Sequence, residues 1–401
     1  MLRQGALLAS VLVLVAATVA GAAPANLACD QEPGARLYWM ERGFCDLEMN
    51  GPERAQGIII WNHGINATTE QWRAPTPPAF RLLQARGWDV VILKRNNLGD
   101  ANVDVALART VERTLEEARL QRERGYRRVV LAGQSFGGYV TLEAASRSAD
   151  IFAAVAMAPG VRPIGANGRL DTSVTERSLR RLKVERVGVI FPKDDALFGN
   201  VTRGESANHI LAGRRVPYLL LDETSGLTGH AGGIGGRFAL MYGLCLNEFL
   251  TAPTLPGTRF TCPPAEDWDA ARELLMPNAA ATGVVEDPGS VSGGLGAFTG
   301  RWYGLLEDTI VFFGLLESGN APPRSLYRWA AFRIGGGIFD VALSENHLSV
   351  AFPNGAGIVV APVGGEMVLT WTSADGTRIV KTVLAREKRP LTATRTTQDR
   401  R

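Results

Sequence analysis

A serine flanked by glycines is the feature of this sequence that most directly suggests chemistry. Ser135 lies at the centre of Gly133–Gly137, with an apolar strand-like run at 129–132 before it and a helix-like run at 138–145 after it. A sharp strand-to-helix turn has a strained backbone that requires small neighbours, and it presents the serine hydroxyl at its tip. We therefore predict Ser135 as a nucleophile, and a glycine-rich turn with a passive serine is the alternative.

A serine hydroxyl attacks well only when a base removes its proton, and the sequence offers four histidines. His63 precedes the serine, His209 lies in a helix-like segment, and His347 lies in a C-terminal strand pattern. His230 follows the last apolar run of the region and lies in the glycine-rich loop 225–236. Such a loop can place an imidazole over the serine, so we predict His230 as the general base.

The imidazole needs a carboxylate that fixes its tautomer and stabilises its protonated form. Asp194 and Asp195 both stand where the apolar run 187–191 ends. We favour Asp195 because the apolar residues 196–198 follow it, and Asp194 remains an alternative. Asp222, at the end of the next run, is the third candidate.

The elements that must position these residues alternate along the chain. From Gly57 to Glu223, continuous apolar runs alternate with amphipathic, helix-like stretches. The runs are 57–64, 88–96, 128–135, 153–160, 187–195 and 216–224. Continuous apolar runs are typical of strands buried on both faces, and their alternation with helices predicts a doubly wound, mostly parallel α/β sheet. The segments 36–44 and 46–56 are candidates for antiparallel edge strands.

Residues from about Gly57 to Phe249 resemble the α/β-hydrolase superfamily, especially its dienelactone-hydrolase-like and esterase- or lipase-like branches. The segments NHG at 62–64 and GQSFGG at 133–138 carry the resemblance, together with the chain order serine, aspartate, histidine. It implies hydrolysis of an ester, thioester or amide through an acyl-enzyme, without a metal or organic cofactor. Dienelactone hydrolases have a cysteine nucleophile where this chain has Ser135, so their substrate is not implied.

The oxyanion of an acyl-transfer intermediate needs backbone donors. One is expected to be the N–H of Phe136, directly after the nucleophile. His63–Gly64 is similar to the HG element of the family's oxyanion loop, which implies a second donor at Gly64 or Ile65. For His63 we expect a structural role in orienting that loop.

The pattern changes in the last third of the chain. We predict a catalytic domain at 29–276, a Gly- and Pro-bearing linker at 277–297, an all-β module at 298–386 and a disordered basic tail at 387–401. The linker is flexible in composition, which allows the two domains to fold independently. Gly300–Trp302 and Arg386 give the module a similarity to calycin barrels, and an unrelated β-sandwich is the alternative. Its aromatic residues are candidates for a glycan or lipid site, although core packing explains most of them.

The first residues indicate export. A cationic start, an apolar run from Ala6 to Val19 and the small residues 20–23 are typical of a cleaved signal peptide at 1–23. We therefore predict a secreted or periplasmic protein without a stable membrane anchor, and an uncleaved anchor is the alternative. Four cysteines agree with an oxidising compartment, and we predict the pairs Cys29–Cys45 and Cys245–Cys262. Two other connectivities and free thiols remain alternatives.

The composition is that of a globular protein, with 46% hydrophobic and 21% charged residues. A net charge of +3 is too small at this length to indicate a nucleic-acid partner. No CxxC pair is present, so the sequence does not predict a zinc site. We expect a serine hydrolase that acts on a small-molecule, lipid or glycan ester. The alternative is a catalytically silent binding protein whose β module recognises a surface glycan or lipid.

Overall fold

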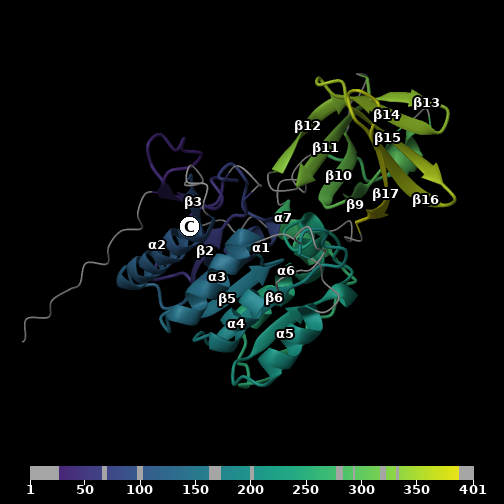
Figure 1. Cartoon of the computed structure of the whole chain (residues 1–401). Coiled ribbons are helices and arrows are strands. Elements are labelled where there is room, and N and C mark those ends of the chain that lie inside the picture. Colours follow the sequence, from purple (N-terminus) through teal and green to yellow (C-terminus); the bar gives the residue numbers. More distant parts are fainter. Residues whose placement is uncertain are drawn as a thin grey trace, which may run out of the picture.

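A computed structural model describes two sheets that form two domains (Figure 1). The described residues are 27–65, 70–96, 103–161, 173–198, 203–276, 283–291, 294–316, 322–330 and 334–387. The predicted signal peptide and the basic tail beyond residue 387 lie outside this part of the chain, as do several residues of the predicted linker.

The first sheet has eight strands in the order β1-β3-β2-β4-β5-β6-β7-β8. Its strands are β1 Tyr38–Arg42, β2 Gly57–Asn62, β3 Trp88–Arg95, β4 Val129–Gln134, β5 Ala153–Met157, β6 Arg186–Ile190, β7 Tyr218–Leu221 and β8 Arg259–Phe260. Only the β1–β3 pair is antiparallel, so the predicted, mostly parallel sheet is confirmed. The second candidate edge segment, 46–56, forms turns instead, because Asp89 accepts hydrogen bonds from the backbone of Asn50 and Gly51.

Helices cover both faces of this sheet, which explains the continuous apolar runs. They are α1 Pro78–Ala85, α2 Val103–Glu123, α3 Phe136–Arg147, α4 Ser173–Arg181, α5 Arg203–Ala212, α6 Gly236–Thr251 and α7 Asp269–Leu275, with short 3-10 turns at η1 Glu223–Ser225, η3 Pro288–Ser290 and η4 Leu295–Phe298. Side chains of α1, α6 and α7 share one apolar cluster with the sheet, and side chains of α2 to α5 share the other.

The second sheet has nine antiparallel strands in the order β12-β11-β10-β9-β17-β16-β15-β14-β13. They are β9 Arg301–Leu306, β10 Thr309–Leu316, β11 Arg324–Ala330, β12 Ile334–Asp340, β13 Ala342–Ser344, β14 His347–Ala351, β15 Gly357–Val363, β16 Glu366–Thr372 and β17 Ile379–Arg386. The sheet curls until β12 contacts β14, which makes a nearly closed barrel. The guanidinium of Arg386 lies 5.8 Å from the ring centroid of Trp302, as in the calycin-like pattern of the sequence.

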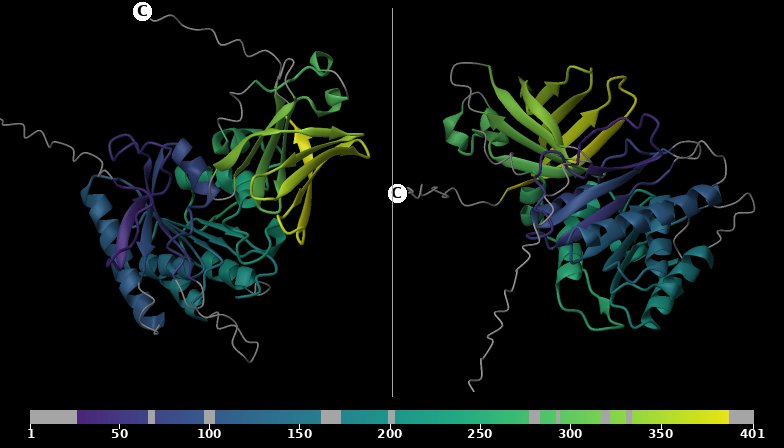
Figure 2. Two further views of the ribbon diagram at one scale, coloured as in Figure 1. Left: turned by 90° about the horizontal axis from the view of Figure 1, so that it is seen from above. Right: turned by 90° about the vertical axis from the view of Figure 1, so that its left-hand side faces the viewer.

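The barrel packs against the helices of the first domain on the side of α6 and α7 (Figure 2). The strand β10 is apolar on both faces: Val311 and Phe313 belong to the barrel core, whereas Ile310 and Phe312 belong to the core around α6 and α7. The backbone N–H of Gly236, at the start of α6, donates to the carbonyl of Asp308 at 2.6 Å. The two domains therefore share a core, although the linker composition allowed independent folding.

The cysteines are paired as Cys29–Cys45 and Cys245–Cys262, which confirms the predicted connectivity. The first disulfide fixes the N-terminal segment beside β1, and the second joins α6 to the segment after β8. Within the described ranges, no helix combines the length and the apolar character that a membrane crossing requires.

Candidate active site

The predicted nucleophile lies on a strained turn between β4 and α3. Ser135 has φ 57° and ψ −123°, in the left-handed region, and its residue is 6% exposed. A Cβ on Gly133 would lie 2.2 Å from the carbonyl oxygen of Gly137, and one on Gly137 would lie 2.0 Å from that of Asn62. Larger residues therefore do not fit, which is the physical reason for the glycine pattern in the sequence.

Three hydrogen bonds fix the serine backbone. The N–H of Ser135 donates to the carbonyl of Met157 at 2.9 Å, and its carbonyl accepts from the N–H groups of Tyr139 and Gly160. The turn is thus held by β5 and α3 together, so the strain does not relax. The same turn places Phe136 at the first position of α3, where backbone N–H groups have no partner within the helix.

His230 and Asp195 lie in contact on two neighbouring loops. Nδ1 of His230 is 3.0 Å from Oδ2 of Asp195. The buried carboxylate also accepts from the backbone N–H groups of Leu197 at 2.9 Å and Phe198 at 3.1 Å. The apolar residues after the aspartate, which favoured Asp195 in the sequence, therefore supply the turn that holds its carboxylate.

The other two carboxylates lie elsewhere. Asp194 is exposed and adopts φ 58°, which turns the chain so that its neighbour faces inward. Asp222 caps the short helix η1 by accepting from the N–H of Thr224 at 3.1 Å, and it lies 3.5 Å from Arg259. Neither contacts His230 among the interactions of the described residues.

The electrostatics of the pair fix the tautomer of the imidazole. Burial alone would raise the pKa of Asp195, but the hydrogen bond and charge of His230 and two backbone donors outweigh it and lower that pKa. The carboxylate is therefore ionised at neutral pH, and it accepts a hydrogen bond from Nδ1–H of His230. Nδ1 is thus the ring nitrogen that faces Asp195, which leaves Nε2 for a partner on the other side of the ring.

The histidine loop is tied to the segment that carries the serine. Nε2 of Gln134, the residue before Ser135, donates to the carbonyl of His230 at 3.1 Å. The ring of His230 also packs against Phe198, with 5.2 Å between the ring centroids. The acid loop, the histidine loop and the serine turn thus meet at the carboxyl edge of the parallel sheet, where ligands bind in open α/β sheets.

Gly64 lies directly beside the serine. A Cβ on Gly64 would lie 3.4 Å from Cβ of Ser135 and 2.8 Å from Oε1 of Gln134, so only a glycine allows this approach without displacing a neighbour. The carbonyls of His63 and Gly64 both accept hydrogen bonds from Nη2 of Arg95. In a trans peptide the carbonyl and the following N–H point in opposite directions. The N–H groups of Gly64 and Ile65 therefore point away from Arg95.

His63 is a structural residue of this loop. Its Nε2 accepts from the backbone N–H of Arg95 at 3.1 Å, and its Nδ1 is 2.8 Å from the carbonyl of Gly64. Burial, and then the charge of Arg95, lower the pKa of His63 well below its usual value. The ring is neutral and fully enclosed, so it orients the loop as the sequence predicted. His209 is exposed on α5, and His347 lies on β14 of the barrel.

Two buried charged residues of the site were missed in the sequence. Arg95, at the end of β3, lies 3.3 Å from the carboxylate of Glu70, and both side chains are enclosed. Burial raises the pKa of Glu70 although Arg95 opposes that rise. The available signal was a basic pair, Lys94–Arg95, at the end of an otherwise apolar run. No pattern in the sequence predicted that this pair would lie beside Glu70.

A cavity of about 450 Å³ adjoins the serine turn. Gly64 and Gln134 line it on the side of Ser135, and its apolar walls are formed by Trp61, Trp72 and Ile234. Polar groups are contributed by Glu70, Gln71 and Arg73. The cavity thus combines two tryptophans and an isoleucine with several polar and charged side chains.

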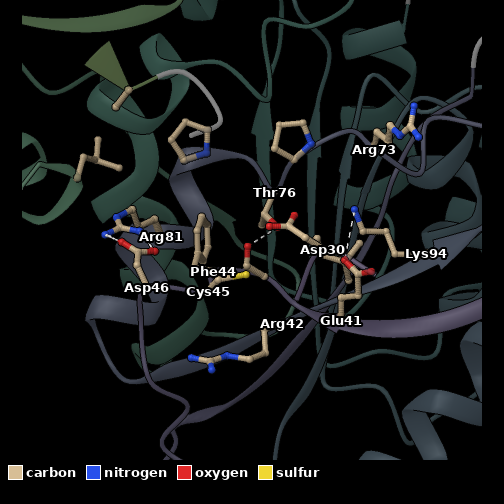
Figure 3. Close-up of a pocket in the computed structure, with 16 residues that line it drawn as sticks. Asp30, Glu41, Arg42, Phe44, Cys45, Asp46, Arg73, Thr76, Arg81 and Lys94 are labelled. Atoms are coloured by element: carbon tan, nitrogen blue, oxygen red, sulfur yellow. Dashed lines mark hydrogen bonds and ion pairs between the residues drawn. The ribbon is translucent and has the colours of Figure 1, made fainter. Parts of the chain in front are cut away.

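A second cavity, of about 320 Å³, lies between α1 and the Cys29–Cys45 disulfide (Figure 3). The charges that line it pair with one another: Arg81 contacts Asp46 at 2.6 Å, and Lys94 lies 3.8 Å from Glu41. These pairs stabilise the N-terminal segment against the sheet. In the part of the chain that the structure describes, no cluster of side chains has a metal-binding arrangement.

This chain is similar to one family model and to several solved structures. Residues 58–229 match the family model described as alpha/beta hydrolase family. An esterase from Pyrococcus furiosus is 17% identical with a TM-score of 0.36, and the match covers 49% of this chain and 82% of that chain. A dipeptidyl peptidase 4 from Porphyromonas gingivalis is 15% identical with a TM-score of 0.37, over 54% of this chain and 33% of that chain.

The 2,6-dihydroxy-pseudo-oxynicotine hydrolase is 13% identical with a TM-score of 0.36, over 58% of this chain and 68% of that chain. No curated protein sequence matches this chain. The family match begins in β2 and ends at the residue before His230, so it spans the serine turn and the acid loop. Residues 58–229 are thus similar to the alpha/beta hydrolase family, and the mostly parallel sheet with helices on both faces is the α/β-hydrolase fold.

Proposed function

We propose that this protein is a serine hydrolase that cleaves a carboxylic ester, a thioester or an amide through an acyl-enzyme on Ser135. The observation that carries the proposal is the contact of 3.0 Å between His230 and an ionised Asp195, on loops tied by Gln134 to the serine turn. A neutral imidazole with a fixed tautomer beside a strained serine is the arrangement that activates a hydroxyl group.

The proposed reaction has two steps. Nε2 of His230 accepts the hydroxyl proton as Oγ of Ser135 attacks the substrate carbonyl, which gives a tetrahedral intermediate. The intermediate expels the alcohol, thiol or amine, which takes the proton from His230, and the acyl group stays on Ser135. Water then attacks the acyl-enzyme in the same way, releases the carboxylic acid and restores the serine.

The negative oxygen of each intermediate needs donors that are fixed in advance. We propose the N–H of Phe136, at the start of α3, and the N–H of Gly64 or Ile65. The carbonyls of His63 and Gly64 are held by Arg95, which supports an N–H direction away from the buried network. Arg95 is thus a positioning residue in this proposal, because it acts through the loop.

The cavity of about 450 Å³ beside Gly64 is the proposed substrate site. Its tryptophan and isoleucine walls favour an apolar acyl or alcohol group of moderate size. The two disulfides are compatible with an exported protein, and we propose that the chain is secreted or periplasmic after removal of residues 1–23.

Labelling with a fluorophosphonate tests the proposal directly. Oγ of an activated serine attacks the phosphorus atom, fluoride leaves, and a stable phosphonyl-serine remains. We expect one label per folded molecule, on the peptide that contains residue 135, and none after heat denaturation. Ser135→Ala should abolish both the label and hydrolysis of an activated ester such as p-nitrophenyl acetate, with an unchanged melting temperature.

Two outcomes would contradict the proposal. One is a label on another serine in the folded protein. The other is an esterase activity of Ser135→Ala within tenfold of the parent, because loss of a triad member lowers kcat by roughly 10⁴-fold or more. Ser146→Ala is a control, since that serine lies at the far end of α3 from the turn and donates to a backbone carbonyl.

A further inference from the structure

The barrel contains a cavity of its own, separate from the hydrolase domain. It has a volume of about 480 Å³ and is lined only by residues between 306 and 380. Five of its lining residues are aromatic: Tyr327, Trp329, Phe339, Phe352 and Trp371. We propose that this cavity binds a flat aromatic molecule that carries one hydroxyl or carbonyl group.

The cavity lies at an open end of the barrel. Along β11, Ser325, Tyr327 and Trp329 alternate onto the inner face, and their exposure rises from 0% through 4% to 38%. The barrel beyond the cavity is filled by fully buried aliphatic side chains such as Leu348 and Val360. The cavity is therefore a cup at the mouth and not a tunnel through the barrel.

One pair of rings in the cup is edge-to-face, and two pairs are tilted at 30° and 37°. Phe339 and Phe352 are 5.0 Å apart at 71°, and Tyr327 lies 5.3 Å from Phe352 and 5.8 Å from Trp329. Edge-to-face and tilted pairs leave ring faces available to another ring. An aromatic ligand would bury these faces, including that of the exposed Trp329.

One polar group of the cup has no hydrogen-bond partner among the described residues. The hydroxyl of Tyr327 makes no hydrogen bond with the described residues, although the side chain is almost completely buried. Burial raises the pKa of this phenol, so it stays protonated and can both donate and accept. The hydroxyl has no protein partner among the described residues and belongs to the cavity lining, so a ligand hydroxyl or carbonyl in the cup can form a hydrogen bond with it.

The shape and polarity of the cup favour an aromatic ligand over two other classes. A long acyl chain needs a tunnel, and the side chains that fill the barrel core leave no room for one. A sugar ring needs several polar partners around it, whereas Glu307, Asn354 and Arg378 of the lining are exposed and Tyr327 is the buried polar residue. The ion pair of Arg378 and Glu307 stands at the exposed rim, with the guanidinium 6.0 Å from the ring centroid of Trp371.

Binding of two probes to the full chain tests this site. We use 2-naphthol and naphthalene, which share a flat ring system and differ by one hydroxyl, and follow tryptophan fluorescence and calorimetry. We expect saturable 1:1 binding of 2-naphthol. Tyr327→Phe should weaken 2-naphthol binding by about two- to tenfold and leave naphthalene binding unchanged. Trp329→Ala should weaken the binding of both probes.

Controls separate this site from the hydrolase domain and from misfolding. Trp72→Ala removes a tryptophan of the hydrolase cavity and should leave both affinities unchanged, as should Ser135→Ala. The melting temperature of Tyr327→Phe should equal or exceed that of the parent, because its hydroxyl loses no partner.

Equal weakening of both probes by Tyr327→Phe, or no effect of Tyr327→Phe and Trp329→Ala, would overturn the proposal. So would saturable binding of decanoate or cellobiose in this cup without binding of 2-naphthol. The serine-hydrolase proposal is untouched by either result.

Discussion

At the scale of single residues, two adjacent carboxylates have opposite environments. Asp195 is buried and accepts from His230 and two backbone N–H groups, whereas Asp194 is exposed with φ 58°. If the proposed function holds, Asp195→Asn should lower kcat on an activated ester by on the order of 10⁴-fold, because an amide no longer fixes the imidazole tautomer. Asp194→Asn should change kcat by less than about twofold. Equal losses of kcat in the two variants would mean that another residue is the carboxylate that acts with His230.

The same carboxylate should contribute to stability in a pH-dependent way. The pKa of Asp195 is lower in the folded protein than its ordinary value of 3.8, so the ionised form is favoured by folding. That stabilisation is present above the pKa of Asp195 in the unfolded chain, and it is lost as the pH falls through the pKa of Asp195 in the folded protein. The melting-temperature difference between the parent and Asp195→Asn should therefore shrink below about pH 4. A difference that stays constant to pH 2 would contradict this, and Asp194→Asn serves as the control.

At the scale of elements, the end of β3 positions the loop that follows β2. Arg95 holds the carbonyls of His63 and Gly64, and it lies against the carboxylate of Glu70. Arg95→Met should lower kcat by roughly ten- to a hundredfold, with little change in KM, because a misplaced loop no longer offers its donors to the transition state. Steady-state kinetics on the activated ester measure the change in kcat and the change in KM separately.

The variant also leaves Glu70 buried without its partner, which costs stability. The double variant Arg95→Met with Glu70→Gln separates the two effects. It should recover most of the melting temperature but not kcat. Recovery of both would mean that Arg95 acts only through the stability of the fold.

The elements of the hydrolase domain could be predicted because each carries its own signal. Apolar runs buried on both faces, and glycines where no Cβ fits, led from the sequence to the mostly parallel sheet and to the turn at Ser135. The Arg95–Glu70 pair could not be predicted, since long-range ion pairs leave no periodicity. The burial of β10 on both faces does have a signal in the sequence, because its run TIVFFGLL is continuously apolar.

At the scale of the whole molecule, this strand connects the stability of the two domains. Phe312 is fully buried in the core shared with α6 and α7. Phe312→Ala should destabilise the protein by about 3–5 kcal/mol and lower the thermal transition of both domains. Trp329→Ala, in the exposed mouth of the same barrel, should leave the hydrolase domain unchanged. Denaturation followed by activity and by circular dichroism distinguishes the two variants.

A chain that ends at residue 276 tests whether the first domain can catalyse the reaction without the barrel. It keeps the serine turn, the acid loop and the histidine loop, so every proposed catalytic group is present. It loses the side chains of β10 and β11 that cover α6 and α7, and it exposes buried residues such as Leu275. We therefore expect a lower melting temperature and a tendency to aggregate, but near-parental kcat on a small ester for each folded molecule, counted by fluorophosphonate titration. A truncated chain that folds and binds the probe but turns over more than tenfold slower would show that the barrel contributes to the active site.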